Sequence, residues 1–154
     1  MNPVGIFGPA LGGDTGTSLE IVKRLLGGLP GVPDLAFGVV DVRDVSDLHL
    51  LAMTRSEAAG ERFLATSGDF MSMLEMARIL RTGIGDRARK VPTRVLPNAL
   101  IRLAGRFDSG MAQLAIELGQ LKNASGKKAE RVLGWMPRSR EEALLASAEC
   151  LLSR

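Results

Sequence analysis

A glycine-rich loop near the N-terminus is the part of this chain whose composition most suggests ligand chemistry. Glycines stand at positions 8, 12, 13 and 16, between an apolar stretch over residues 4–7 and a helical pattern that starts near Thr17. Backbone amides of such a loop, next to a helix N-terminus, can bind a phosphate. A P-loop, however, has Lys and Ser or Thr after its last glycine, whereas Asp14 follows Gly13, and the dinucleotide pattern G-x-G-x-x-G is absent. An ordinary surface loop is therefore favoured over a phosphate site.

Other chemically capable residues do not form a catalytic or metal-binding pattern. His49 lies between two leucines on a helical pattern, and no nucleophile or acid has the spacing of a triad, so a structural role is predicted. Asp41, Asp44 and Asp47 lack the spacing of a calcium loop, and Asp44 is better interpreted as a helix cap. Cys150 is the single cysteine and cannot form an internal disulfide. We expect a reduced protein without a metal.

Capping signals predict where the helices begin and end. Three Ser/Thr-x-x-Glu capping boxes are present: Thr17 with Glu20, Ser72 with Glu75, and Ser139 with Glu142. Asp44 predicts a further helix start. Glycines at positions 27, 28, 83 and 134 predict helix ends.

Apolar runs and prolines predict the remaining elements. Short strands are expected over residues 4–7, 35–42 and 62–65. After the prolines at 92 and 97, short helices are expected over residues 98–106, 109–118 and 125–133. The first half of the chain therefore alternates strands and helices, and the second half is predicted to be helical.

Length and hydropathy predict one globular domain. The chain has 154 residues, 45% of them hydrophobic, and a mean hydropathy of +0.12, enough for one ordinary core. No apolar run is long enough to span a bilayer, and the N-terminus lacks a basic region followed by an apolar stretch. We expect a soluble, cytoplasmic protein with no membrane partner.

The net charge is only +3, but basic residues are concentrated between positions 78 and 106. One acid, Asp86, accompanies eight basic residues there: Arg78, Arg81, Arg87, Arg89, Lys90, Arg94, Arg102 and Arg106. Such a stretch can attract an anionic partner, but the stacking aromatics typical of nucleic-acid binding are missing, and Phe107 lies just past its end. A solvated basic face is favoured, and no nucleic-acid partner is expected.

Four segments in a fixed order carry a family resemblance: NPVGIFGP at 2–9, FGVVDVRDVSDLHLLAM at 37–53, GERFLATSGDFMSMLEMARILR at 60–81 and KKAERVLGWMPRSREEAL at 127–144. Together they resemble the C-terminal half of extended short-chain dehydrogenases/reductases of the dihydroflavonol-reductase-like branch. The resemblance implies an α/β fold, the substrate-binding portion of a Rossmann-like enzyme, helix-rich with a few short strands. Residues 1–154 would form the C-terminal domain, with the N-terminal dinucleotide-binding half absent.

The resemblance also implies site residues. The family's nicotinamide pocket and its cofactor-proximal helix start correspond to the cofactor-binding positions Asn2, Pro3, Val4, Gly5 and Ser18. The corresponding substrate-binding positions are Thr17, Phe37 and Gly38, with the loop of residues 9–17. Sugar-nucleotide epimerases of this class have an arginine at the position of Phe37, so a small or aromatic carbonyl compound is the expected substrate.

The chain departs from the family in its catalytic residues. It contains no tyrosine, so the Tyr-x-x-x-Lys pair is missing, and so is the glycine-rich turn that binds pyrophosphate. We expect the substrate-binding half of an NAD- or NADP-dependent oxidoreductase that neither binds the cofactor nor turns over alone, with no catalytic residue of its own. A non-catalytic binding or regulatory protein is the alternative. The expected partners are the carbonyl substrate and either the missing half or a second copy, with a homo-oligomer forming through residues 4–7.

Overall fold

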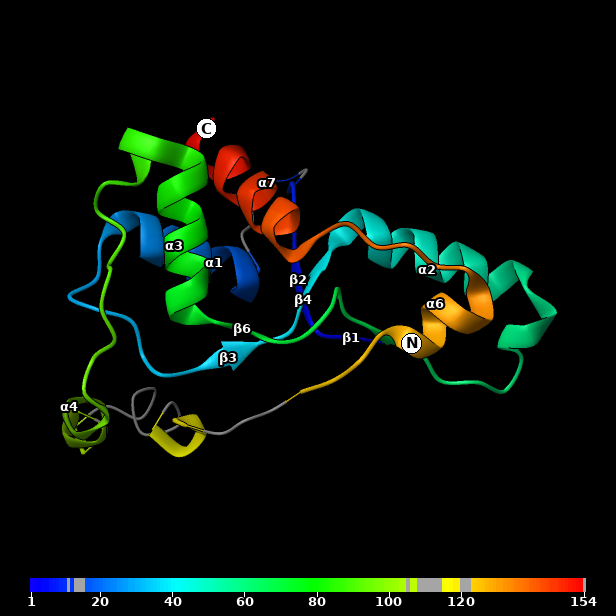
Figure 1. Ribbon diagram of the computed structural model, residues 1–154, viewed down its shortest axis with the longest axis horizontal. Coiled ribbons are helices and arrows are strands. Elements are labelled where there is room, and N and C mark those ends of the chain that lie inside the picture. The colour runs from blue at the N-terminus through cyan, green and yellow to red at the C-terminus, as the bar shows by residue number, and fades with distance from the viewer. Residues whose placement is uncertain (11, 13–15, 105, 108–114, 120–122, 154) are drawn as a thin grey trace.

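Helices dominate the computed structural model, which describes residues 1–10, 12, 16–104, 106–107, 115–119 and 123–153 (Figure 1). The helices are α1 (Thr17–Gly27), α2 (Val42–Thr54), α3 (Met73–Ile84), α4 (Asn98–Ala104), α6 (Lys127–Leu133) and α7 (Arg140–Leu152), with 3-10 turns η1 (Ser56–Ala58) and η2 (Gly85–Ala88). The strands are β1 (Asn2–Pro3), β2 (Gly5–Phe7), β3 (Ala36–Phe37), β4 (Val39–Asp41), β5 (Leu64–Ala65) and β6 (Met71–Ser72). The predicted helix-rich α/β class is confirmed.

The strands pair in twos within the described residues. β1 runs parallel to β5 and β2 parallel to β4, whereas β3 is antiparallel to β6. The strand predicted over residues 35–42 is therefore split at Gly38, because its first part pairs with β6 and its second with β2. This split brings the N-terminal segment, the middle of the chain and the start of α3 into one junction.

Two apolar clusters form the core. The larger one lies where α1, α3 and α7 pack together, and it contains Phe7, Leu25 and Met76, each at most 1% exposed. The smaller one lies between α2, α6 and β5 and contains Phe63 and Trp135. Figure 1 shows α3 and α7 side by side, with α2 and α6 at the other end of the molecule.

Two of the three predicted capping boxes are confirmed. The hydroxyls of Ser72 and Ser139 accept hydrogen bonds from the amides of Glu75 and Glu142, both at 3.1 Å. The box at Thr17 is wrong, because Gly16 is the N-cap of α1 and makes no side-chain bond.

The predictions for Asp44 and Gly83 were also wrong. Asp41 caps α2 by accepting from the amide of Arg43, and Asp44 lies buried one turn later. Helix α3 continues through Gly83 to Ile84, and Gly85, with φ of 66°, follows it. A Cβ on Gly83 would meet the side chain of Leu145 on α7, so the glycine lets these two helices pack closely without moving that side chain.

The helix ends at Gly27 and Gly134 agree with the prediction, since Gly28 (φ 95°) follows α1 and Gly134 (φ 67°) follows α6. Helices α4 and α6 fall inside their predicted ranges. The helix expected over residues 109–118 lies mostly outside the described residues. In the described part of the chain, no helix combines the length and the apolar character needed to cross a membrane.

The strand at residues 4–7 offers less apolar surface than the sequence suggested. Phe7 is 1% exposed in the larger cluster, and the half-buried Val4 and Ile6 pack against the smaller one. The expectation of a free apolar edge at residues 4–7 was therefore wrong, because β4 and the helices already cover most of these side chains.

Candidate functional site

Gly5 and Gly38 let the segments around them approach closely at the junction of the N-terminal segment, the middle of the chain and the start of α3. The amide of Gly5 donates to the carbonyl of Gly38 at 3.1 Å. A Cβ on Gly5 would lie 2.8 Å from that carbonyl oxygen, and a Cβ on Gly38 would lie 2.7 Å from both Val4 Cβ and Phe70 Cε1. Larger residues at either position would push the strands apart. The structure thus brings together three of the predicted site residues: Val4, Gly5 and Gly38.

Ser18 joins this cluster from the first turn of α1. Its hydroxyl oxygen is 3.8 Å from the Cβ position of Gly5. Thr17 does not join it, because one residue along a helix corresponds to a rotation of about 100°. Thr17 is exposed and lines a separate cavity of about 370 Å³ with Glu20, Ile21 and Arg24. Ser18, expected at the cofactor, and Thr17, expected at the substrate, therefore lie on different faces of α1.

Strand β1 presents one unusual backbone group. The amides of Asn2 and Val4 donate to the carbonyls of Phe63 and Ala65, at 2.9 and 3.2 Å. Successive residues of a strand direct their backbone groups to opposite sides, so the carbonyl of Pro3 points away from β5. Proline has no amide to place beside it. The exposed edge of β1 therefore offers an acceptor without an adjacent donor, which suits the amide group of a carboxamide.

Phe37 stands at the end of β3, next to the break at Gly38. It pairs with Met71 and packs, half-buried, against the larger apolar cluster. Phe70 was missed by the sequence reasoning, although its ring lies against the Cβ position of Gly38. The Phe70 ring therefore lies against this junction, and Phe37 precedes Gly38 in the chain. The sequence offered no signal for Phe70, because its proximity to Gly38 depends on the pairing of β3 with β6.

A buried carboxylate lies at the carboxyl end of β4. Asp41 is fully buried and accepts hydrogen bonds from Arg43 Nε at 2.8 Å and Arg43 Nη2 at 2.7 Å. Burial alone would raise the pKa of Asp41. The hydrogen bonds from the Arg43 side chain and amide, with the charges of Arg43 and Arg138, outweigh burial and lower this pKa below its ordinary value. Asp41 is therefore held ionised as a structural anion rather than a proton donor.

Asp44 holds the segment between α6 and α7. Its carboxylate is 2% exposed and accepts from the Arg138 amide at 2.8 Å and from the Arg138 guanidinium. Its backbone carbonyl accepts from Trp135 Nε1 at 3.0 Å. The short-range pattern of the sequence did not predict this clamp, since Asp44 and Arg138 lie far apart along the chain.

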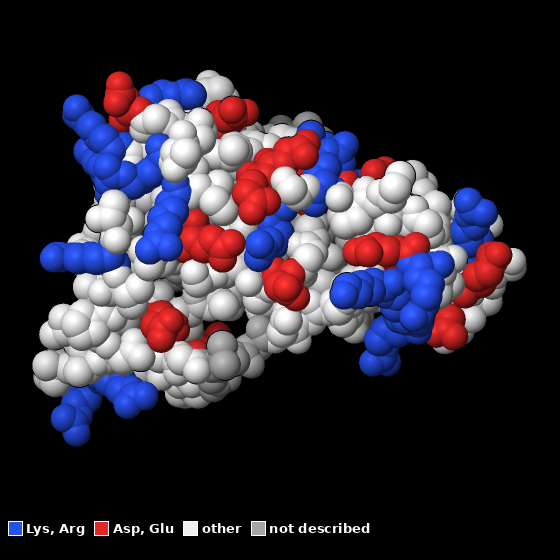
Figure 2. Space-filling model, viewed as in Figure 1, with Lys and Arg blue, Asp and Glu red and all other residues white. Residues whose placement is uncertain are grey.

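The remaining candidates have structural surroundings. His49 Nδ1 is 2.8 Å from the carbonyl of Val45 on the same helix. Over the residues that the structure describes, no three His, Cys, Asp or Glu side chains gather as a metal site would require. Basic side chains gather at the end of the molecule formed by α3 and η2 (Figure 2).

Comparisons with known proteins identify relatives. No family model matches the chain. It is 35% identical over 81 residues to a cinnamoyl-CoA reductase of Medicago truncatula, an alignment that covers 53% of this chain and 24% of that protein. It is 26% identical to the NADPH-dependent methylglyoxal reductase of Saccharomyces cerevisiae, over 99% of this chain and 42% of the relative.

A solved structure has the same fold. The crystal structure of yeast methylglyoxal/isovaleraldehyde reductase with NADPH superposes with a TM-score of 0.71 at 24% identity, over 99% of this chain and 42% of that one. The chain is a relative of the extended short-chain dehydrogenases/reductases. The chain spans less than half the length of the relatives that it matches. The family resemblance drawn from the four sequence segments is thereby confirmed.

Proposed function

We propose that this chain is the substrate-binding part of an NAD(P)-dependent reductase of small or aromatic carbonyl compounds, and that turnover requires a dinucleotide-binding part. The observation that carries the proposal is the alignment of 99% of the chain with an NADPH-dependent methylglyoxal reductase. The chain's lack of any tyrosine supports the need for a further part, because the proton donor of the family that it resembles is a tyrosine.

The part of the junction around Gly5 and Ser18, where β1, β2 and the start of α1 meet, is the proposed cofactor side of the site. The outward carbonyl of Pro3 would accept from the carboxamide amide group, and Ser18 beside Gly5 would donate to the cofactor from the start of α1. Bound NAD(P)H would supply a hydride to the carbonyl carbon of the substrate. The residues of this chain would orient the two reactants, and the close strands at Gly5 and Gly38 would exclude water from one side.

The proposed substrate side is apolar. The Phe70 ring lies against Gly38, Phe37 precedes Gly38 in the chain, and neither side chain carries a charge, so this side would accept an alkyl or aromatic group and would not bind a diphosphate. Relatives named for methylglyoxal and for cinnamoyl-CoA reduction support a carbonyl substrate in this class. The choice between NAD and NADP depends on groups that contact the ribose, which this proposal assigns to the dinucleotide-binding part.

The test is complementation. The dinucleotide-binding part of the yeast methylglyoxal reductase would be joined ahead of Met1, and NADPH oxidation with methylglyoxal would be followed. We expect turnover by the fusion and none by the chain alone. A matched fusion in which the supplied catalytic tyrosine is replaced by phenylalanine should be inactive.

The Ser18 assignment has its own control. Ser18→Ala in the fusion should raise the KM for NADPH about fivefold, the effect of one hydrogen bond of about 1 kcal/mol. Ser46→Ala, on the exposed face of α2, removes a hydroxyl whose one hydrogen bond among the described residues is to the carbonyl of Val42, and it should leave this KM unchanged. A folded fusion that binds NADPH but oxidises none would instead favour a non-catalytic binding protein.

A further inference from the structure

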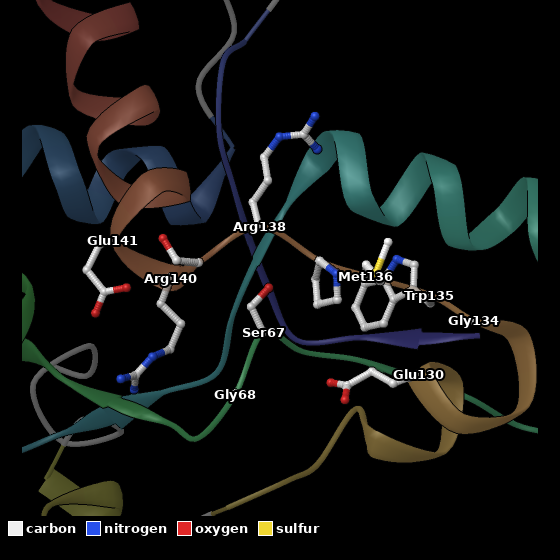
Figure 3. Close-up of a pocket in the computed structure, with 11 residues that line it drawn as sticks. Ser67, Gly68, Glu130, Gly134, Trp135, Met136, Arg138, Arg140 and Glu141 are labelled. Carbon is white, nitrogen blue, oxygen red and sulfur yellow. The ribbon is translucent and has the colours of Figure 1, made fainter.

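A second cavity lies apart from the β1–β2 junction. It has a volume of about 620 Å³ and opens between α6, the start of α7 and the residues that follow β5 (Figure 3). This volume is within the range of small-molecule sites. We propose that this cavity binds a small organic cation, an alkylammonium or alkyl diammonium ion. The proposal is independent of the reductase function.

The floor of the cavity contains an unsatisfied hydroxyl. Ser67 is 4% exposed, and its Oγ has no hydrogen-bond partner. Its backbone is fixed, because its amide donates to the carbonyl of Val39 at 2.8 Å. Figure 3 shows its side chain directed toward the backbone at Arg138. Buried hydroxyls without a partner are uncommon in folded proteins, and a ligand with N–H groups would satisfy this one.

Two carboxylates in the wall are unpaired. Glu130 extends from α6 on one side of Ser67 and Glu141 from α7 on the other (Figure 3). Neither carboxylate makes an ion pair or a hydrogen bond with a described residue, whereas the neighbouring carboxylates of Glu75 and Glu142 do. The cavity therefore has two carboxylates without partners among the described residues, one on each side of Ser67.

The arginines of the same wall are already occupied. Arg138 pairs with Asp44 and lies 3.7 Å from Glu142. Arg140 donates to the carbonyls of Asp69 and Phe70 and pairs with Glu75 at 3.4 Å. Because both guanidinium groups have carboxylate partners, the free charge of the cavity is negative. This balance disfavours an anionic ligand.

The apolar part of the wall favours an organic cation over a metal ion. Trp135 and the half-buried Pro137 line the cavity beside the carboxylates. Among the described residues, no three His, Cys, Asp or Glu side chains gather here as a metal site would require, and the two carboxylates lie on opposite sides of Ser67. An alkyl chain can instead lie along the apolar surface while its ammonium groups meet Glu130 and Glu141.

The single tryptophan of the chain is a built-in reporter, since Trp135 lines this cavity. The whole chain would be titrated with cadaverine into the tens of millimolar at constant ionic strength, with tryptophan fluorescence and calorimetry as parallel readouts. We expect saturable binding of cadaverine, weaker binding of butylamine and none of succinate. Absence of saturation in both readouts, or saturable binding of succinate instead, would overturn the proposal.

Charge-neutral variants locate the ligand. Glu130→Gln and Glu141→Gln should each weaken cadaverine binding about threefold, and the double variant about tenfold. Ser67→Ala should weaken it about threefold. Glu149→Gln removes the same charge from an exposed position farther along α7 and should change nothing. Circular dichroism would confirm that each variant is folded. Equal affinities for the wild-type chain and the double variant would refute the site.

Discussion

Replacing Asp44 by alanine tests the clamp between α2 and the segment that leads into α7. The carboxylate of Asp44 is 2% exposed and holds both the amide and the guanidinium of Arg138. Breaking a fully buried ion pair costs about 3–5 kcal/mol, because the remaining charge is left without a partner. The Arg138 side chain is 34% exposed, so water can partly solvate it after the change. We therefore expect Asp44→Ala to lower the free energy of unfolding by about 2–3 kcal/mol.

Urea denaturation followed by circular dichroism measures this change, with an m-value equal to that of the wild-type chain. Asp47→Ala is the matched control, since Asp47 is exposed on the same helix, and it should alter stability by less than about 0.5 kcal/mol. A double-mutant cycle with Arg138→Ala should give a coupling energy of at least about 1 kcal/mol. The reasoning fails if Asp44→Ala and Asp47→Ala have equal effects, or if the coupling is near zero.

Three further outcomes are expected. Because the pKa of Asp41 is lowered in the folded state, its ion pair stabilises the fold at pH values above the ordinary carboxyl pKa. This stabilisation is lost as the pH falls through the lower pKa of the folded state. The urea midpoint of Asp41→Asn should therefore fall less steeply on acidification than that of the wild-type chain. Gly38→Ala should destabilise the chain by about 1–3 kcal/mol in the same assay, because its Cβ would meet Val4 and Phe70, whereas Gly27→Ala, with open space around it, should not. Ile6→Asp should lower the free energy of unfolding by about 2–3 kcal/mol in the same assay, because the half-buried Ile6 packs against the smaller apolar cluster and the change would bring a charge into it.

Sequence patterns correctly predicted those helix ends that are determined by interactions between residues close in sequence. The serine caps at positions 72 and 139 and the glycine that ends α6 satisfy backbone groups within one turn, so their spacing in the sequence was sufficient. The interpretation of Asp44 as a cap failed for the opposite reason. Its partner, Arg138, belongs to the other end of the chain, and only the packing of α2 beside the segment after α6 brings them together.

The candidate site shows the same division. Family resemblance directed attention to Val4, Gly5, Ser18 and Gly38, and the structure places them in one junction. Glycine stands at positions 5 and 38 because the backbone segments touch there, and this contact between distant segments cannot be predicted from spacing in the sequence. Thr17 and Ser18 are adjacent in sequence but lie on different faces of α1, and the start of that helix had to be known before they could be assigned.

The substrate profile of the fusion with the yeast dinucleotide-binding part tests the central claim most directly. If this chain forms the carbonyl pocket, the ratio of kcat/KM for methylglyoxal and an aromatic aldehyde should differ from that of the yeast enzyme by about tenfold or more. The KM for NADPH should change less, because most cofactor contacts belong to the supplied part. A fusion that retains the yeast ratio, or a folded fusion that oxidises no NADPH with any carbonyl compound, would contradict the account.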